Sequence, residues 1–291
     1  MYAVTLIAPP NSGLLKSKVV KNLCEAWEAK DYVYLASDEA AEFIIPKIPA
    51  DRWSMWSKFQ ELKIDLVIQE DKMRKKSILL ADMDSTIIEQ ECIDELASEI
   101  GIGERVKLIT AEAMNGKLDF EEALIERVSL LNGFSTKIID KVLNERITYM
   151  SGASVLLATM KANGCYSALV SGGFTLFTKK IAADLGFDEN HANVLLTSEN
   201  KLIGKVQKPI LGKKAKVEQL DRIASKLNLS ARQVIAVGDG ANDLDMLSKA
   251  GTGVALHAKP SVAEKCDIRI NFGDLTALLF MQGYSKENFV I

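Results

Sequence analysis

Residues 77–86 read SILLADMDST, a short apolar run followed by two aspartates. Three later runs have the same form: CYSALVSGG (165–173), QVIAVGDG (233–240) and TGVAL (252–256). Short apolar runs of this kind are typical of buried parallel strands. Helical patterns lie between them, over residues 152–164, 175–186 and 215–228. The alternation predicts an α/β fold with a doubly wound parallel sheet of the Rossmann type.

One segment interrupts the alternation of strands and helices. From Glu91 to about Glu145, four helical patterns follow one another with no strand between them. Gly101–Gly103, Asn115–Gly116 and Asn132–Gly133 mark the turns, at the spacing that short helix connections require. We therefore expect a helical cap inserted at about 91–148 into an α/β domain at 73–291.

The first 72 residues differ in composition from the rest. All three tryptophans precede residue 57, and the charge run DKMRKK (71–76) has the character of a linker. The β-rich runs are YAVTLIA (2–8), DYVYLA (31–36) and KIDLVIQ (63–69), and residues 16–30 have helical spacing. The pattern predicts a small α+β N-terminal domain at 1–72.

Composition excludes several classes of protein. With 291 residues, 48% of them hydrophobic, and a net charge of −3, the chain is globular and lacks the basic excess of nucleic-acid or anionic-membrane binders. No basic leader and no run of 18 apolar residues occurs, and the four cysteines form no metal or disulfide pattern. We expect a cytoplasmic protein with a small-molecule partner; a homodimer is compatible with these features.

Acidic residues end two of the predicted strands. Ligands bind at the carboxyl ends of strands in open α/β sheets, so Asp82 and Asp84 should meet Asp239 and Asp243 in one crevice. Carboxylates this close repel one another unless a cation or a proton lies between them. An oxygen-only cluster favours a hard cation, and Mg²⁺ is the usual one where phosphate is handled.

The predicted strand end at 171–173 and one helix supply groups for an anion. Ser171-Gly172-Gly173 is expected to open a helix directly after its strand, where free N–H groups favour a phosphate. Lys216, in the helix before the last acidic strand end, can add a mobile positive charge. Taken singly, these motifs are ordinary turns, caps and solvated charges; together they indicate phosphoryl transfer through an aspartyl-phosphate.

The four motifs together resemble those of the haloacid dehalogenase (HAD) superfamily of phosphotransferases: DMDST (82–86), SGG (171–173), Lys216 and GDGAND (238–243). More narrowly, DMDSTIIEQECIDELA (82–97) and MNGKLDFEEALIERVSLL (114–131) are similar to the phosphoserine phosphatases. That resemblance implies a Mg²⁺-dependent hydrolysis of O-phospho-L-serine to L-serine and phosphate, the last step of serine biosynthesis.

The resemblance also implies roles for the strand-end residues. Asp82 would be the nucleophile and Asp84 the general acid and base. The metal would be held by the Asp82 carboxylate, the Asp84 backbone carbonyl and Asp239, with Asp243 supporting it from behind. The phosphate would be held by Ser171, Gly172, Lys216 and Asn242.

Two residues of the predicted cap would recognise the amino-acid end. Glu91 would bind the substrate ammonium, and Arg127 would grip the carboxylate with its planar guanidinium. Met114 and Phe120 would close the pocket. The plainer interpretation of Glu91 and Arg127, a charged pair on a helix surface, stays open at this point.

Other functions also stay open. A phosphatase or phosphotransferase of another small phosphomonoester would use the same scaffold. A phospho-accepting receiver module would explain the aspartates but is far smaller and needs no helical insertion. A non-catalytic amino-acid-binding protein is the third alternative.

The first 70 or so residues resemble only weakly an ACT-like regulatory domain, and no glycine-marked ligand turn follows the first strand.

Overall fold

The computed structural model describes residues 1–291, and its centre is a six-stranded parallel sheet. The strands are β5 (Ile78–Ala81), β6 (Tyr166–Phe174), β7 (Glu189–Asn193), β10 (Val234–Gly238), β11 (Thr252–Leu256) and β12 (Ile268–Ile270). Their order in the sheet is β12-β11-β10-β5-β6-β7. The chain therefore winds outward in both directions from β5, which confirms the predicted doubly wound fold.

Helices cover both faces of this sheet. One buried cluster joins Leu79 and Ala81 to helices α7 (Ala153–Ala162), α8 (Thr175–Leu185) and α12 (Ala277–Met281). Another joins Ile78 and Leu80 to α9 (Lys213–Lys226), α10 (Leu244–Lys249) and α11 (Pro260–Ala263). Because successive strand side chains point to opposite faces, a strand buried on both faces is apolar at every position, as β5 is.

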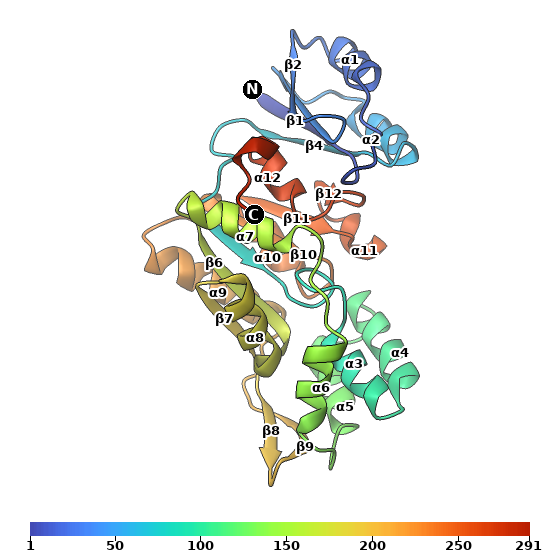
Figure 1. The fold of residues 1–291 in the computed structure, drawn as a ribbon, viewed down its shortest axis with the longest axis vertical. Coiled ribbons are helices and arrows are strands. Elements are labelled where there is room, and N and C mark those ends of the chain that lie inside the picture. The colour runs from blue at the N-terminus through green and yellow to red at the C-terminus, as the bar shows by residue number, and fades with distance from the viewer.

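Four helices separate β5 from α7 and form the cap. They are α3 (Cys92–Glu99), α4 (Gly103–Met114), α5 (Phe120–Ser129) and α6 (Lys137–Glu145), as the sequence predicts. The two linkers to the cap are joined by hydrogen bonds from Glu89 N to Thr148 O (3.0 Å) and from Met150 N to Ile87 O (2.9 Å). Figure 1 shows the cap at one end of the long axis, beyond the carboxyl ends of β5 and β6.

A hairpin that the sequence analysis did not predict lies against the cap. Its strands are β8 (Leu195–Ser198) and β9 (Lys201–Val206). Gly133 N donates to Leu202 O and Leu202 N donates to Phe134 O, both at 2.8 Å, so β9 is bonded to the loop after α5. The sequence pattern does not predict the hairpin, because its strands, LLTS and KLIGKV, are short and do not alternate clearly between apolar and polar residues.

The N-terminal residues form a separate four-stranded antiparallel sheet in the order β2-β3-β1-β4. Its elements are β1 (Tyr2–Ile7), α1 (Ser17–Ala26), β2 (Tyr32–Ala36), β3 (Ala40–Ile45), α2 (Arg52–Glu61) and β4 (Asp65–Glu70). β1, β2, β4 and α1 match predicted runs. β3 and α2 lie outside them, because AAEFII does not alternate and α2 buries only Phe59.

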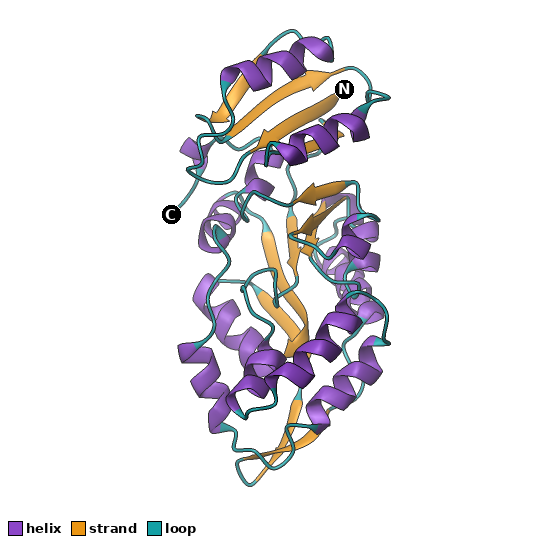
Figure 2. Cartoon of the chain, turned by 90° about the vertical axis from the view of Figure 1, so that its right-hand side faces the viewer, coloured by secondary structure: helices purple, strands orange, loops and turns teal.

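The N-terminal sheet is buried on both faces. Helices α1 and α2 cover one face, and the other packs on α12, since Ile7, Ala40 and Val67 belong to the same buried cluster as Leu278. The fully buried Asp65 accepts hydrogen bonds from the backbone N–H groups of Asn271 (2.8 Å), Phe272 (3.0 Å) and Gly273 (2.8 Å). Figure 2 shows this sheet stacked at the end of the molecule opposite to the cap.

The remaining predictions about the chain concern thiols and membranes. The four cysteines are free thiols and all are buried. None of the helices combines the length and apolar character needed to cross a bilayer. Two short 3₁₀ segments, η1 (Ala231–Gln233) and η2 (Lys286–Asn288), complete the described elements.

Candidate active site

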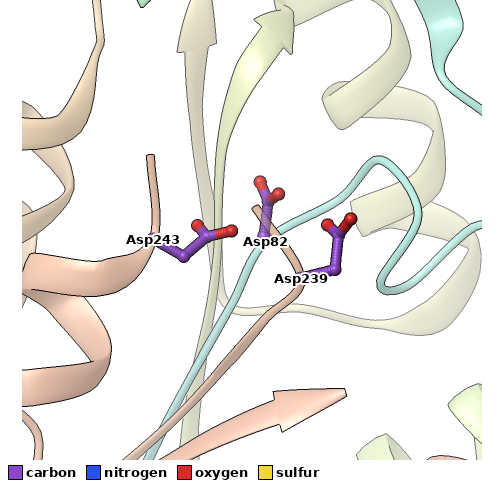
Figure 3. A group of neighbouring side chains, drawn as sticks. All are labelled: Asp82, Asp239 and Asp243. Atoms are coloured by element: carbon purple, nitrogen blue, oxygen red, sulfur yellow. The ribbon is translucent and has the colours of Figure 1, made fainter. Parts of the chain in front are cut away.

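Acidic side chains meet where β5 and β10 end. Asp82 follows β5, and Asp239 and Asp243 follow β10, its neighbour in the sheet. One carboxylate oxygen from each of the three lies within 4.8 Å of the others. Figure 3 shows the Asp82 carboxylate between those of Asp243 and Asp239. The parallel strand order therefore brings together acids that are more than 150 residues apart in the chain.

Lys216 neutralises part of this cluster. Its Nζ lies 2.6 Å from Asp82 Oδ1 and 2.5 Å from Asp243 Oδ1, and its side chain is completely buried. Burial alone would lower the pKa of Lys216, but the charges of Asp243 and Asp82 outweigh burial and raise it. Burial and the charge of Asp243 raise the pKa of Asp82 to about 7, against the effect of Lys216. The single positive charge of Lys216 thus offsets the negative charges of Asp82 and Asp243 only in part.

The remaining charge fits a divalent cation. Asp243 is satisfied by Lys216 and by the Gly240 N–H (3.0 Å), whereas Asp239 Oδ2 and Asn242 Oδ1 are buried without a hydrogen-bond partner. Burial, then the charges of Glu91, Asp243 and Asp82, raise the pKa of Asp239. Buried oxygens with no donor are costly unless a cation compensates them, and an all-oxygen set suits a hard metal ion.

Asp84 and Glu91 form a second acidic pair nearby. Asp84 Oδ1 accepts a hydrogen bond from Cys92 N (3.1 Å), and Glu91 Oε1 accepts one from Ser85 Oγ (2.8 Å). Burial raises the pKa of Asp84 well above its usual value, and the charge of Glu91 adds to the effect. A raised pKa favours the protonated form of a carboxyl, and this form can donate its proton in a reaction.

Arg127 points into the interior and is only 2% exposed. Its Nε donates to Ala123 O (3.0 Å) and its Nη1 to Thr110 Oγ1 (2.9 Å). Thr110 in turn donates to Asp94 Oδ1 (2.6 Å). The guanidinium is therefore held in one orientation with further N–H donors left for a ligand, which argues against a helix-surface position.

One cavity joins these groups. It has an empty volume of about 350 Å³. Charged and small residues of the strand-end loops and the cap line it together with apolar residues of the cap and of β6: Asp82, Asp84, Glu91, Arg127, Ser171, Gly172, Gly173, Asn242, Ile93, Met114, Phe120, Leu124 and Phe174. The cap is closed on the core, because Ala241 N donates to Met114 O (3.1 Å). A Cβ added at Gly172 would lie 2.4 Å from Phe120 Cζ, so this close approach requires glycine.

The predicted setting of Ser171-Gly172-Gly173 is wrong in one respect. These residues do not open a helix: β6 continues to Phe174, and α8 begins at Thr175. The pairing register of β6 with β7 shifts between Val170 and Phe174, and Gly173 N donates to Ser171 Oγ (2.8 Å). The two glycines allow the extended chain to bulge here, so the loop faces the cavity from a strand end.

The structure brings all the predicted site residues to this cavity or directly behind it. Seven of them line it directly: Asp82, Asp84, Glu91, Arg127, Ser171, Gly172 and Asn242. Lys216, Asp239 and Asp243 stand behind it in the charge cluster described above. The prediction that these motifs converge at the strand ends is therefore consistent with the geometry.

Three residues beside the site were not predicted from the sequence. Asp94 and Thr110 hold Arg127, and nothing in their spacing marks them. Lys259 lies with its Nζ 3.5 Å from Asp239 Oδ2, and its N–H donates to Asp239 O (3.1 Å). It follows the predicted strand run 252–256, so the strand-end rule that found the aspartates would also have found Lys259.

Comparison with known proteins agrees with this geometry. The family model for haloacid dehalogenase-like hydrolases matches residues 79–248. A phosphoserine phosphatase from Methanocaldococcus jannaschii is 44% identical over 206 residues, which cover 71% of this chain and 97% of that protein.

Two solved structures extend the comparison. A HAD-family hydrolase from Salmonella enterica subsp. enterica serovar Typhi is 30% identical, with a TM-score of 0.85 over 97% of this chain and 98% of the other. A substrate-bound phosphoserine phosphatase complex is 43% identical, with a TM-score of 0.68 over 71% of this chain and 98% of the other. The chain therefore belongs to the phosphoserine phosphatase family of haloacid dehalogenase-like hydrolases.

Proposed function

We propose that this chain hydrolyses O-phospho-L-serine to L-serine and phosphate. One observation carries the proposal: a single cavity is lined both by Asp82 and Ser171, which suit a phosphate, and by Glu91 and Arg127. Phosphoserine carries an ammonium that Glu91 can bind and a carboxylate that Arg127 can grip. A general phosphatase would need no buried pair of opposite charges at this place.

In this proposal the reaction has two steps. The Asp82 carboxylate attacks phosphorus and the bond from phosphorus to the seryl oxygen breaks, while Asp84 gives that oxygen its proton. A water then attacks the aspartyl-phosphate, Asp84 takes a proton from it, and phosphate leaves with the Asp82 carboxylate restored. The raised pKa of Asp84 suits the first transfer, because the group must hold a proton near neutral pH.

The phosphate is held by Ser171, Gly172, Lys216 and Asn242 in this assignment. Lys216 offsets charge on Asp82 and on the phosphoryl oxygens, and it is already placed within 2.6 Å of Asp82. Closure of Phe120 over Gly172 excludes water from the cavity, which strengthens each charged contact inside it.

The metal is Mg²⁺ in our proposal, held by the Asp82 carboxylate, the Asp84 backbone carbonyl and Asp239. When bound, it supplies positive charge that offsets the charge of the phosphoryl group. Asp243 supports the site through Lys216 and the Gly240 N–H. Asp239 Oδ2 supports this assignment, because it is buried, accepts no hydrogen bond and has the Lys259 ammonium only at 3.5 Å.

The division of the chain is also part of the proposal. Residues 1–72 form the N-terminal domain, and residues 73–291 form the catalytic domain with its cap at about 91–148. This division is supported by the cavity, which contains no residue from the first 72.

Phosphate release from a panel of small phosphomonoesters tests the function. We expect phosphoserine to be the best substrate, EDTA to abolish turnover and Mg²⁺ to restore it. Protein quenched during turnover should carry a base-labile phosphate on Asp82, and Asp82→Asn should carry none. Comparable rates across the panel, or release that falls when a second alcohol captures the phosphoryl group, would contradict specific hydrolysis.

A further inference from the structure

Asn193, at the end of β7, makes hydrogen bonds that the proposed mechanism does not explain. Its side chain is only 2% exposed. It lies outside the motifs that the sequence analysis identified and does not line the cavity. A buried amide is costly unless its donors and acceptor are satisfied, so the partners of Asn193 show what it holds.

The partners are backbone groups of two distant segments. Asn193 Nδ2 donates to Gly172 O (2.9 Å) and to Leu211 O (3.2 Å), and Leu211 N donates to Asn193 Oδ1 (2.7 Å). One amide side chain therefore links the end of β6 to the residue that precedes Gly212, the N-cap of α9.

The hydrogen bond from Asn193 to the Gly172 carbonyl affects the position of Ser171 Oγ. The Gly172 carbonyl and the Gly173 N–H belong to the same peptide unit, so the bond to Asn193 sets the orientation of both. The Gly173 N–H donates to Ser171 Oγ (2.8 Å). Since the hydroxyl accepts this bond, its own hydrogen stays available for a phosphate oxygen in the cavity.

The hydrogen bonds between Asn193 and Leu211 affect the position of Lys216. Gly212 follows Leu211 and accepts a hydrogen bond from Lys216 N (3.3 Å), in the first turn of α9. Holding Leu211 therefore sets where α9 begins, and with it the position from which Lys216 reaches Asp82. The hairpin β8–β9 leaves the core at Asn193 and returns before Leu211, so the same amide also closes the base of the hairpin.

We propose that Asn193 is a positioning residue that holds Ser171–Gly172 and the start of α9, with Lys216, at a fixed separation around the phosphate. The inference rests on the proposed function, which places phosphate at these groups. It assigns no contact with substrate to Asn193 itself.

Asn193→Asp tests the inference, because it keeps the size and the acceptor for Leu211 N but loses the donor to Gly172 O and Leu211 O. We expect the inhibition constant of inorganic phosphate to rise about tenfold or more, with KM for phosphoserine rising in parallel. Inhibition by L-serine, which binds through Glu91 and Arg127, should change less than about twofold. Asn190→Asp is the matched control, since it introduces the same carboxylate on the same strand, where Asn190 Oδ1 accepts a hydrogen bond from Thr178 Oγ1 (2.9 Å).

If the role of Asn193 is purely structural, the substitution would lower the melting temperature and the fraction of active protein but leave the inhibition constant of phosphate unchanged. That result would overturn the inference. Equal weakening of phosphate and L-serine binding would overturn it too. If Asn193→Asp does not fold, NMR of the wild-type Asn193 side-chain NH₂ replaces it: the signal should shift on adding phosphate and not on adding L-serine. No shift with phosphate would contradict the inference.

Failure of the proposed function gives a different result. It would appear as absent phosphoserine turnover in the wild-type protein. The phosphate inhibition constant could then still be measured with whichever phosphomonoester the wild type hydrolyses, so the two failures are distinguishable.

Discussion

At the scale of single residues, the site depends on which charges are buried together. Arg127 is held by Ala123, Thr110 and, through Thr110, by Asp94. Such a guanidinium cannot turn away when a ligand is absent, so its interaction with a substrate carboxylate costs little ordering entropy. This preorganisation makes Arg127 and Glu91 the residues whose substitution should separate phosphoserine from other substrates.

Arg127→Ala should lower kcat/KM for phosphoserine by about 30- to 1000-fold, because a bidentate charged contact in a closed cavity is worth about 2–4 kcal/mol. Glu91→Gln should lower it in the same direction. Hydrolysis of p-nitrophenyl phosphate, which lacks both groups, is the built-in control and should hardly change. Equal losses with both substrates would show that Arg127 only supports the cap.

Lys216→Met should destabilise the fold as well as abolish activity. It leaves the buried carboxylates of Asp82 and Asp243 without their cation, and breaking a buried pair in this way costs about 3–5 kcal/mol. Urea unfolding at pH 8 measures the loss, with the exposed Lys214→Met as control. Lowering the pH to 5, below the pKa of about 7 of Asp82, should reduce the deficit, because protonation of Asp82 removes part of the uncompensated charge. An equal deficit at both pH values would contradict this account.

At the scale of elements, two features depend on contacts between segments far apart in the chain. β6 continues through Ser171–Gly173 as a bulged strand because Asn193 and Ser171 satisfy the peptide between the two glycines. The hairpin β8–β9 forms although its sequence is weakly patterned, because β9 bonds to the loop after α5. Local propensity alone predicts neither feature.

Asp65, at the start of β4, anchors the N-terminal sheet to the loop after β12. Asp65→Ala leaves three backbone N–H groups without their acceptor, so we expect a loss of about 3 kcal/mol in the free energy of unfolding. Denaturant unfolding measures it, and the exposed Asp31→Ala should have almost no effect. A loss below about 1 kcal/mol would mean that water replaces the carboxylate at little cost.

At the scale of the whole molecule, the N-terminal sheet and the cap lie at opposite ends of the central sheet (Figure 1). No residue of the N-terminal sheet lines the cavity, yet its inner face is buried against α12. The M. jannaschii relative aligns over 97% of its own length while covering 71% of this chain, so that protein has little room for such a sheet. Catalysis and stability should therefore respond differently to its removal.

A truncated protein that begins at Met73 should keep kcat for phosphoserine within about threefold but unfold at a lower temperature, because the apolar face of α12 becomes exposed. Activity at saturating substrate and thermal unfolding, each compared with the full chain, measure the two effects. A truncated protein that is folded and inactive would show that the N-terminal sheet contributes to the site.

The doubly wound sheet, the cap and the meeting of Asp82, Ser171 and Asp239 could be predicted from the sequence, because strand runs and the residues that end them are local patterns and parallel order brings the strand ends together. Three sets of contacts form only in the folded chain: Thr110 and Asp94 hold Arg127, Asn193 joins Gly172 to Leu211, and Asp65 anchors the N-terminal sheet. These contacts join residues that are separated along the chain and leave no local pattern. Their partners are mostly backbone groups, and a backbone group looks the same at every position of a sequence.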